Sequence, residues 1–67
     1  MKISYNKLWK LLIDKNMKRK DLQEVAGISS ASIAKLGKGD NITTDVLLRI
    51  CDALGCTIED IIETIKD

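Results

Sequence analysis

Aliphatic side chains recur three and four residues apart along most of the chain, and isolated glycines at Gly27, Gly39 and Gly55 interrupt this pattern. A spacing of three and four places side chains on one face of an α-helix, whereas strict alternation would indicate a strand. The chain has no proline and only four glycines, which favours helices over a turn-rich β fold. We therefore expect an all-α protein made of short helices joined by tight turns.

The length of 67 residues leaves room for one hydrophobic core, so residues 1–67 are expected to form a single domain. Ten Ile and eight Leu, against one Trp, one Tyr and no Phe, indicate a core packed from aliphatic side chains. No apolar run approaches the ~18 residues that a membrane span requires, and the N-terminus lacks the apolar core of a signal peptide. We expect a cytoplasmic protein.

The two cysteines, Cys51 and Cys56, are five positions apart, and the chain contains no histidine. A structural zinc site usually needs four Cys or His ligands, so neither a metal nor another cofactor is expected. Both cysteines are expected to be reduced thiols that pack as small apolar groups.

Three helices are predicted before Gly39. The first follows Ser4 as its N-cap and ends at Asn16, because Asn tolerates the left-handed conformation common at helix ends. The second runs from about Arg19 to Ala26 and ends at Gly27, and the third is capped by Ser29 and stopped by Gly37 and Gly39. The inward-facing residues should be Leu8, Leu11, Leu12, Ile13, Leu22, Val25, Ala26, Ile33 and Leu36.

Two further helices are predicted after Thr43. Thr43 caps the fourth, in which Leu47, Ile50, Cys51 and Leu54 follow the helical spacing, and Gly55 ends it. Thr57 and Asp60 form the T-x-x-D version of a capping box, which predicts a last helix with Ile58, Ile61, Ile62 and Ile65 on one face. Together with Leu48, Ile65 adds more apolar surface than so small a bundle readily hides. This excess predicts a homodimer formed through the C-terminal helices.

Charge is distributed unevenly along the chain although the net charge is only +1. Residues 1–38 carry nine basic and three acidic side chains, a net charge of +6, whereas residues 39–67 carry two basic and seven acidic side chains, a net charge of −5. The N-terminal half is therefore suited to bind a polyanion.

The stretch from Leu22 to Leu36 places two short helices around one glycine. Gly27 is expected to have a positive φ, which a Cβ atom disfavours, and Ile28 is expected to fill the gap between the helices. The outer side of the third helix is then small and polar, with Lys35 able to reach a base edge or a phosphate.

Two segments, KDLQEVAGISSASIAKLGKG and TTDVLLRICDALGCTIEDII, carry a wider resemblance. Over about Tyr5 to Glu63 the chain resembles the lambda-repressor-like, or Cro/cI-type, helix-turn-helix family, and in particular its compact stand-alone bacterial members. The resemblance implies a five-helix DNA-binding bundle whose second and third helices form the motif, at about residues 18–38. The helix around residues 29–37 would then occupy the major groove.

The resemblance also implies a role for individual residues. The bases would face the first turns of the third helix, at Ser30, Ala31, Ser32 and Lys35. The phosphate backbone would be held by Lys18, Arg19 and Lys20 at the start of the second helix, by the amide of Gln23, and by Lys38, Asn41 and Thr43 after the third helix.

Two positions depart from the family pattern. Position 23 is commonly alanine in the family because the helices cross tightly there, so the stem of Gln23 must lie flat or the crossing must open. Gly37 stands where the family often has Glu, and the third helix is expected to fray a residue early. Tyr5 and Trp9 are expected to be packing and edge residues, since single-stranded nucleic-acid binders interleave several aromatics along a groove.

Enzyme chemistry finds no support in the sequence, which lacks histidine, a P-loop, a dinucleotide fingerprint and a cysteine with a basic partner nearby. Two functions stay open. The first is a sequence-specific transcriptional regulator that binds double-stranded DNA as a dimer, with no membrane partner and no evident small-molecule ligand. The second is a protein-binding adaptor, or an antitoxin-like partner, that uses the same fold.

Overall fold

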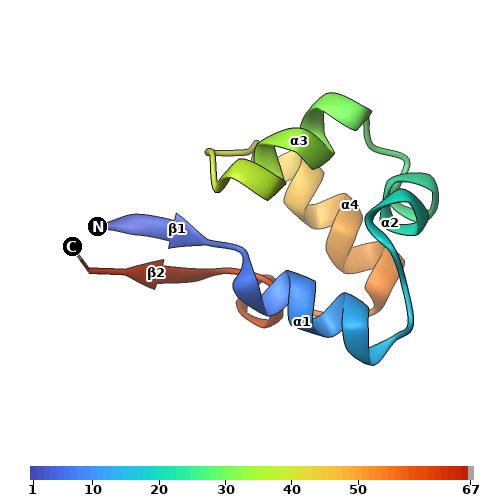
Figure 1. Ribbon diagram of the computed structural model, residues 1–67, viewed down its shortest axis with the longest axis horizontal. Coiled ribbons are helices and arrows are strands. Elements are labelled where there is room, and N and C mark those ends of the chain that lie inside the picture. The colour runs from blue at the N-terminus through green and yellow to red at the C-terminus, as the bar shows by residue number, and fades with distance from the viewer. Residues whose placement is uncertain (67) are drawn as a thin grey trace.

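A computed structural model describes residues 1–66 of the chain. These residues form a small helical bundle from which a ribbon of two short strands projects to one side (Figure 1). The two ends of the described residues lie at the tip of that ribbon (Figure 1). In chain order the elements are β1 (Lys2–Ser4), α1 (Asn6–Asp14), α2 (Arg19–Ala26), α3 (Ser30–Lys38), α4 (Thr44–Leu54), the 3₁₀ turn η1 (Ile58–Asp60) and β2 (Glu63–Ile65).

The four α-helices of residues 1–66 end in the same way. Each is followed by a residue in the left-handed conformation, and these residues are Asn16, Gly27, Gly39 and Gly55. The next N–H group then donates to the carbonyl five positions earlier, from Met17 to Leu12, Ile28 to Gln23, Asp40 to Lys35, and Cys56 to Cys51. This is the Schellman motif, which satisfies carbonyl groups that have no partner inside the helix. The helix ends predicted at these four residues are confirmed.

Side-chain caps begin two of the helices as predicted. The Ser29 hydroxyl accepts the Ser32 N–H at 3.1 Å, and the Thr43 hydroxyl accepts the Val46 N–H at 3.3 Å. Ser4 is also close to its predicted role, because its hydroxyl accepts the Asn6 N–H at 3.2 Å, although Ser4 itself belongs to β1. Such bonds satisfy N–H groups that would otherwise lack a partner at the start of a helix.

The core is mostly aliphatic, and each of the four α-helices contributes one fully buried side chain to it, as does the residue after η1. These side chains are Leu8 of α1, Leu22 of α2, Leu36 of α3, Ile50 of α4 and Ile61, which follows η1. The prediction was wrong for two residues, because Ile13 is 74% exposed and Val25 is 57% exposed. Each is the last but one residue of a short helix.

The predicted helical fold is confirmed in part, because four of the five predicted helices form and the fifth does not. The capping box is present, with the Thr57 N–H donating to Asp60 Oδ2 at 2.9 Å, but within residues 1–66 it begins only the three-residue turn η1. Residues 63–65 then form β2, which pairs antiparallel with β1 so that Ile3 faces Thr64. The fold is therefore mostly helical, with four α-helices and a strand pair in the described residues.

The reason lies in the residues after the box. Four of the residues 61–65 are β-branched (Ile61, Ile62, Thr64 and Ile65), and β-branched side chains lose rotamer freedom in a helix but pack well on a pleated surface. The N-terminal residues of β1 supply the hydrogen-bonding partner that a strand requires.

The predicted early end of α3 is also wrong. Gly37 is inside the helix, which continues to Lys38, and Gly39 is the residue that ends it. No helix within residues 1–66 has the length and apolar character needed to cross a lipid bilayer.

Candidate nucleic-acid interface

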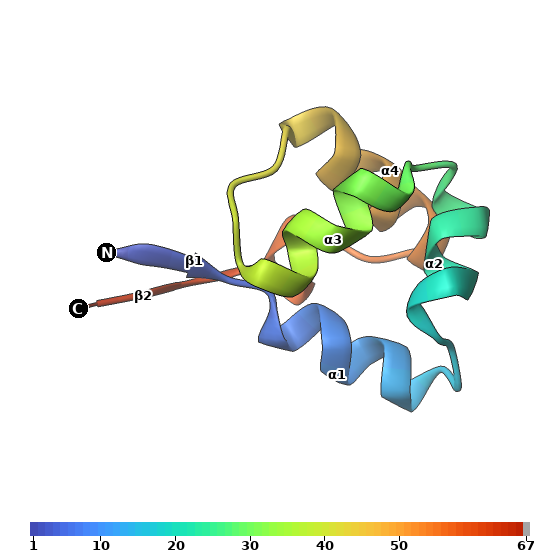
Figure 2. The same cartoon turned by 45° about the horizontal axis from the view of Figure 1, so that its top comes forward.

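Helices α2 and α3 are joined by a turn that begins at Gly27. Its φ of 64° and ψ of 38° are left-handed, as predicted, and the buried side chain of Ile28 follows directly. Leu22 and Leu36 are fully buried in the same hydrophobic cluster as Ile28. Figure 2 shows α3 crossing the face of the bundle, with α2 at one side of it and α1 below it. The pair therefore has the geometry of a helix-turn-helix.

The outer side of α3 is small and open to solvent. Ser30, Ala31 and Lys35 are exposed, and Ser32 is half-buried. The Ser32 hydroxyl accepts a hydrogen bond from the Ser29 hydroxyl at 3.1 Å, which holds it beside the helix start. Three of the four residues predicted to face the bases are thus exposed on α3, with Lys35 as the long cationic side chain among them.

The residues predicted to hold phosphates come from two segments. Lys18, Arg19 and Lys20 are exposed at the start of α2 or just before it, whereas Lys38, Asn41 and Thr43 are exposed at the end of α3 and in the loop after it. Gln23 is half-buried, and its carbonyl accepts the Ile28 N–H that closes the turn. The start of α2 lies against the second half of α3, since the Arg19 side chain touches the position of Gly37.

Arg19 is held by contacts that the sequence did not reveal. Its guanidinium carbon is 4.2 Å from the centre of the Trp9 ring, a cation–π arrangement. A Cβ atom at Gly37 would be only 2.9 Å from Arg19 Nη1, so the glycine makes room for the arginine. These three residues belong to α1, α2 and α3, and no local spacing in the sequence links them.

Arg49 is a second residue that sequence reasoning missed. Its Nη1 donates to the carbonyl of Gly27 at 3.2 Å, and its Nε pairs with Asp45 Oδ2 at 3.1 Å. The four-residue spacing from Asp45 to Arg49 could have predicted the ion pair. The bond to Gly27 joins α4 to the turn between α2 and α3, and only the folded chain shows it.

Tyr5 holds the loop after α3 in place. Its ring is buried, and its hydroxyl donates to the carbonyl of Asp40 at 2.8 Å. Burial, followed by the nearby Asp40 carboxylate, raises the pKa of Tyr5, so the hydroxyl keeps the proton that it donates. The prediction that Tyr5 is a packing and edge residue is confirmed.

Two short helices joined at a left-handed glycine, with a small cationic outer side on the second helix, define a helix-turn-helix DNA-binding protein. The chain belongs to the Cro/C1-type HTH DNA-binding domain family, whose model matches residues 7–67. The family resemblance predicted from the sequence is confirmed.

A solved structure is similar over almost the whole chain. The crystal structure of the transcriptional regulator VanUg, form II, is 52% identical and superposes with a TM-score of 0.94. The match covers 98% of this chain and 88% of that one. No curated protein matched the chain.

Proposed function

We propose that this DNA-binding regulator contacts its operator sequence-specifically with α3 in the major groove. Ser30, Ala31, Ser32 and Lys35 then face the base edges. The observation that supports this most directly is the exposed, small outer side of α3, because short side chains let a helix backbone approach the floor of the groove. The proposed role is binding alone, with no catalysis.

Phosphate contacts fix the orientation of the helix. Lys18, Arg19 and Lys20 bind the backbone on one side of α3, and Lys38, Asn41 and the Thr43 N–H bind it on the other, while the Gln23 amide reaches the strand beside α2. Arg19 is suited to this role because its contact with Trp9 restrains a side chain that would otherwise lose rotamer entropy on binding.

The protein binds DNA as a symmetric dimer in this proposal, with half-sites ~34 Å apart. The last helix expected in the interface does not form, so the proposal now rests on exposed apolar side chains of α4 and β2. Leu48 is 54% exposed and Ile65 is 37% exposed. Burying such side chains between two copies would remove apolar surface from water.

A salt titration tests the electrostatic part of the proposal. If roughly six basic residues neutralise phosphates, the slope of log affinity against log salt concentration should be about −5. The measurement is fluorescence anisotropy of a labelled duplex obtained by selection from random DNA. Affinity that does not change with salt would contradict this binding mode.

A double charge reversal separates the regulator from a protein-binding adaptor, the other function that the fold allows. Arg19→Glu with Lys35→Glu should abolish measurable binding to the selected duplex without changing the melting temperature by more than a few degrees. The matched control is Lys10→Glu with Lys15→Glu, which changes the net charge equally at two exposed residues outside both the proposed DNA interface and the proposed dimer surface. If both double variants lose affinity equally, α3 is not the binding element. If the first variant retains its effect on gene expression, the adaptor function is favoured.

A further inference from the structure

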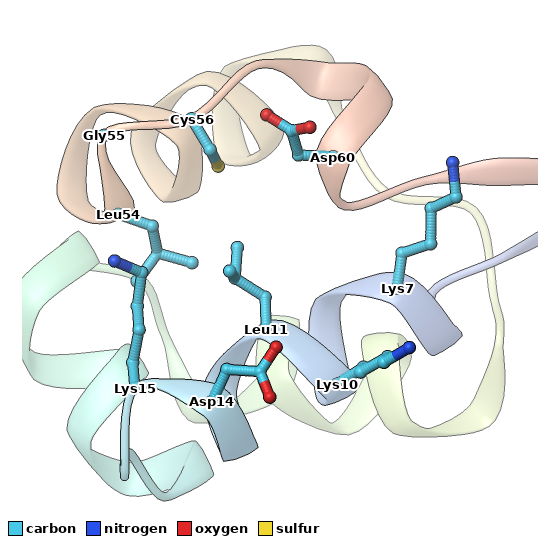
Figure 3. A pocket seen from close by; sticks show the side chains of 9 residues that line it. All are labelled: Lys7, Lys10, Leu11, Asp14, Lys15, Leu54, Gly55, Cys56 and Asp60. Carbon is cyan, nitrogen blue, oxygen red and sulfur yellow. The ribbon is translucent and has the colours of Figure 1, made fainter.

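A cavity of about 430 Å³ lies on the side of the molecule where α1 meets the turn after α4 (Figure 3). Its walls come from α1 and the residue after it, from the end of α4, and from η1. The lining residues are Lys7, Lys10, Leu11, Asp14, Lys15, Leu54, Gly55, Cys56 and Asp60. The space is large enough to admit small polar molecules.

Cys56 is the cysteine that lines this cavity. Figure 3 shows its sulfur pointing into the space, toward Leu11. Cys56 is half-buried, whereas Cys51, one turn from the end of α4, is only 7% exposed. Both are free thiols, as predicted. A small molecule in the cavity can therefore reach Cys56 but not Cys51.

The backbone holds the two cysteines next to each other. Gly55 is left-handed with a φ of 64°, and the Cys56 N–H donates to the Cys51 carbonyl at 3.1 Å. These are the two positions of the Schellman motif whose side chains are usually in contact. At the end of α1 the same two positions are taken by the apolar pair Leu12 and Met17.

The surroundings keep the Cys56 thiol protonated. Burial is the largest cause of its raised pKa, followed by the charge of Cys51, a hydrogen bond between the two side chains and the charge of Asp60, while Lys15 acts in the opposite direction. Only a small fraction of Cys56 is therefore thiolate at neutral pH. Because the thiolate is the form that attacks a disulfide, the reaction is slow at neutral pH and faster at alkaline pH.

We propose that Cys56 and Cys51 form a dithiol site that exchanges with small disulfides entering the cavity. The Cys56 thiolate attacks one sulfur of the small disulfide, forming a mixed disulfide and releasing one small thiolate. The Cys51 thiolate then attacks the Cys56 sulfur, forming the Cys51–Cys56 disulfide and releasing the second small thiolate. The protein loses two electrons and two protons, and the small disulfide gains them as two thiols.

The second step requires little movement. Disulfides form between residues whose Cα atoms lie about 4.4–6.8 Å apart, and a backbone hydrogen bond between the same two residues holds them at such a separation. The product would join the end of α4 covalently to the segment that leads to η1. This proposal does not depend on DNA binding.

The test is the reaction of the full chain with oxidised glutathione at mildly alkaline pH, followed by intact mass spectrometry. The native protein should pass through a mixed disulfide to a product that has lost two hydrogens, and dithiothreitol should reverse the reaction. Cys51→Ala should stop at the mixed disulfide. Cys56→Ala should react at least about tenfold more slowly, because Cys51 is buried. Circular dichroism melting shows that each variant is folded under the conditions used.

Three results would overturn the proposal. One is equal reaction rates for Cys51→Ala and Cys56→Ala, which would mean that the thiols react only when the chain unfolds. Another is a native protein that keeps its glutathione without forming the internal disulfide. The third is a native protein that does not react although its urea-unfolded form does.

Discussion

The chain contains the same start signal twice, and the two copies lead to different structures. After Gly27, the Ser29 cap begins α3, a helix of nine residues. After Gly55, the box of Thr57 and Asp60 begins η1, a turn of three residues. Both glycines are left-handed, but the bonds at the two caps differ. The Ser29 hydroxyl accepts the Ser32 N–H, whereas the Thr57 N–H and hydroxyl donate to Asp60 Oδ2.

The two copies differ in the residues that come after the cap. Ala31, Ala34, Lys35 and Leu36 are strong helix formers, so α3 continues until Gly39. After η1 the chain is rich in β-branched residues, and β1 provides a partner for them. A capping signal therefore predicts where a helix begins, whereas propensity and long-range pairing decide how far it extends.

The largest expected effect tests whether the C-terminal segment is anchored by one side chain. Ile61 is fully buried and lies between η1 and β2, so Ile61→Ala should lower the free energy of unfolding by about 3 kcal/mol through lost burial and a cavity. For a domain of this size such a loss lowers the melting temperature by roughly 12–24 °C. Calorimetry measures both quantities.

The matched control is Ile65→Ala, since Ile65 is the same residue type but 37% exposed in β2. Its loss should stay below about 1 kcal/mol because Ile65 is already partly exposed to solvent and lies outside the core cluster. Equal losses for the two variants would show that the strand pair, not Ile61, holds the segment.

The backbone signals in the sequence were sufficient to place the four helices. Asn16 and Gly27 needed only their own conformational preferences to predict a helix end. The prediction of a fifth helix failed because the capping box is a local signal, whereas the strand that pairs with this segment comes from the other end of the chain. The predicted burial of Val25 failed for a related reason. Helical spacing shows which residues share a face, but it does not show how many of them the neighbouring elements cover.

A second prediction compares the two left-handed glycines directly. Gly27 and Gly55 each have a φ of 64°, and a Cβ atom at either would meet nothing within 4 Å. Gly27→Ala and Gly55→Ala should therefore each lower the free energy of unfolding by about 1–2 kcal/mol, from backbone conformation alone. Chemical denaturation measures the loss. Replacement by Asn should lower the free energy of unfolding less than Ala does at both sites, because Asn tolerates this conformation.

Unequal losses would break the comparison. If Gly55→Ala were tolerated and Gly27→Ala were not, the chain after α4 could change its path without penalty. The turn before α3 would then be the only one of the two whose geometry the core requires.

A third prediction compares the caps. Ser29→Ala should destabilise the protein by about 1 kcal/mol, because the Ser32 N–H loses its acceptor at the start of a full helix. Thr57→Ala should have a smaller effect, since η1 contains only three residues. Ser29→Thr, which keeps the hydroxyl oxygen, is the control and should retain most of the stability. A larger loss at Thr57 than at Ser29 would contradict the comparison.

Much of the proposed interface could also be predicted from the sequence, but not the contacts that support it. The outer residues of α3 follow from helical spacing once Leu36 and Ile33 face inward. The contacts of Arg19 with Trp9 and of Arg49 with Gly27 could not be found, because each joins residues that belong to different elements of the fold. Sequence patterns locate the side chains of a site, and tertiary packing determines how they are held.

The smallest expected effect concerns Asp60. The Thr57 N–H and hydroxyl both donate to its carboxylate, at 2.9 and 3.1 Å, and they lower the pKa of Asp60 below its ordinary value. A lowered pKa in the folded state means that the contribution to stability is present above the ordinary carboxyl value of about 4 and is lost as pH falls through the folded value. The pKa is measured by NMR titration of the carboxyl carbon.

Variants at Thr57 and Asp60 show whether the capping-box hydrogen bonds stabilise the protein although no helix follows them. Thr57→Val keeps the N–H donor but removes the hydroxyl, so the pKa of Asp60 should move part of the way back toward its ordinary value. Asp60→Asn should reduce the acid dependence of the melting temperature in the pH range below about 4. If the pKa of Asp60 does not respond to Thr57→Val, the box is too weak to direct the chain at η1. A shift in the expected direction means that the local signal is intact, and that the β-branched residues after it decide the outcome.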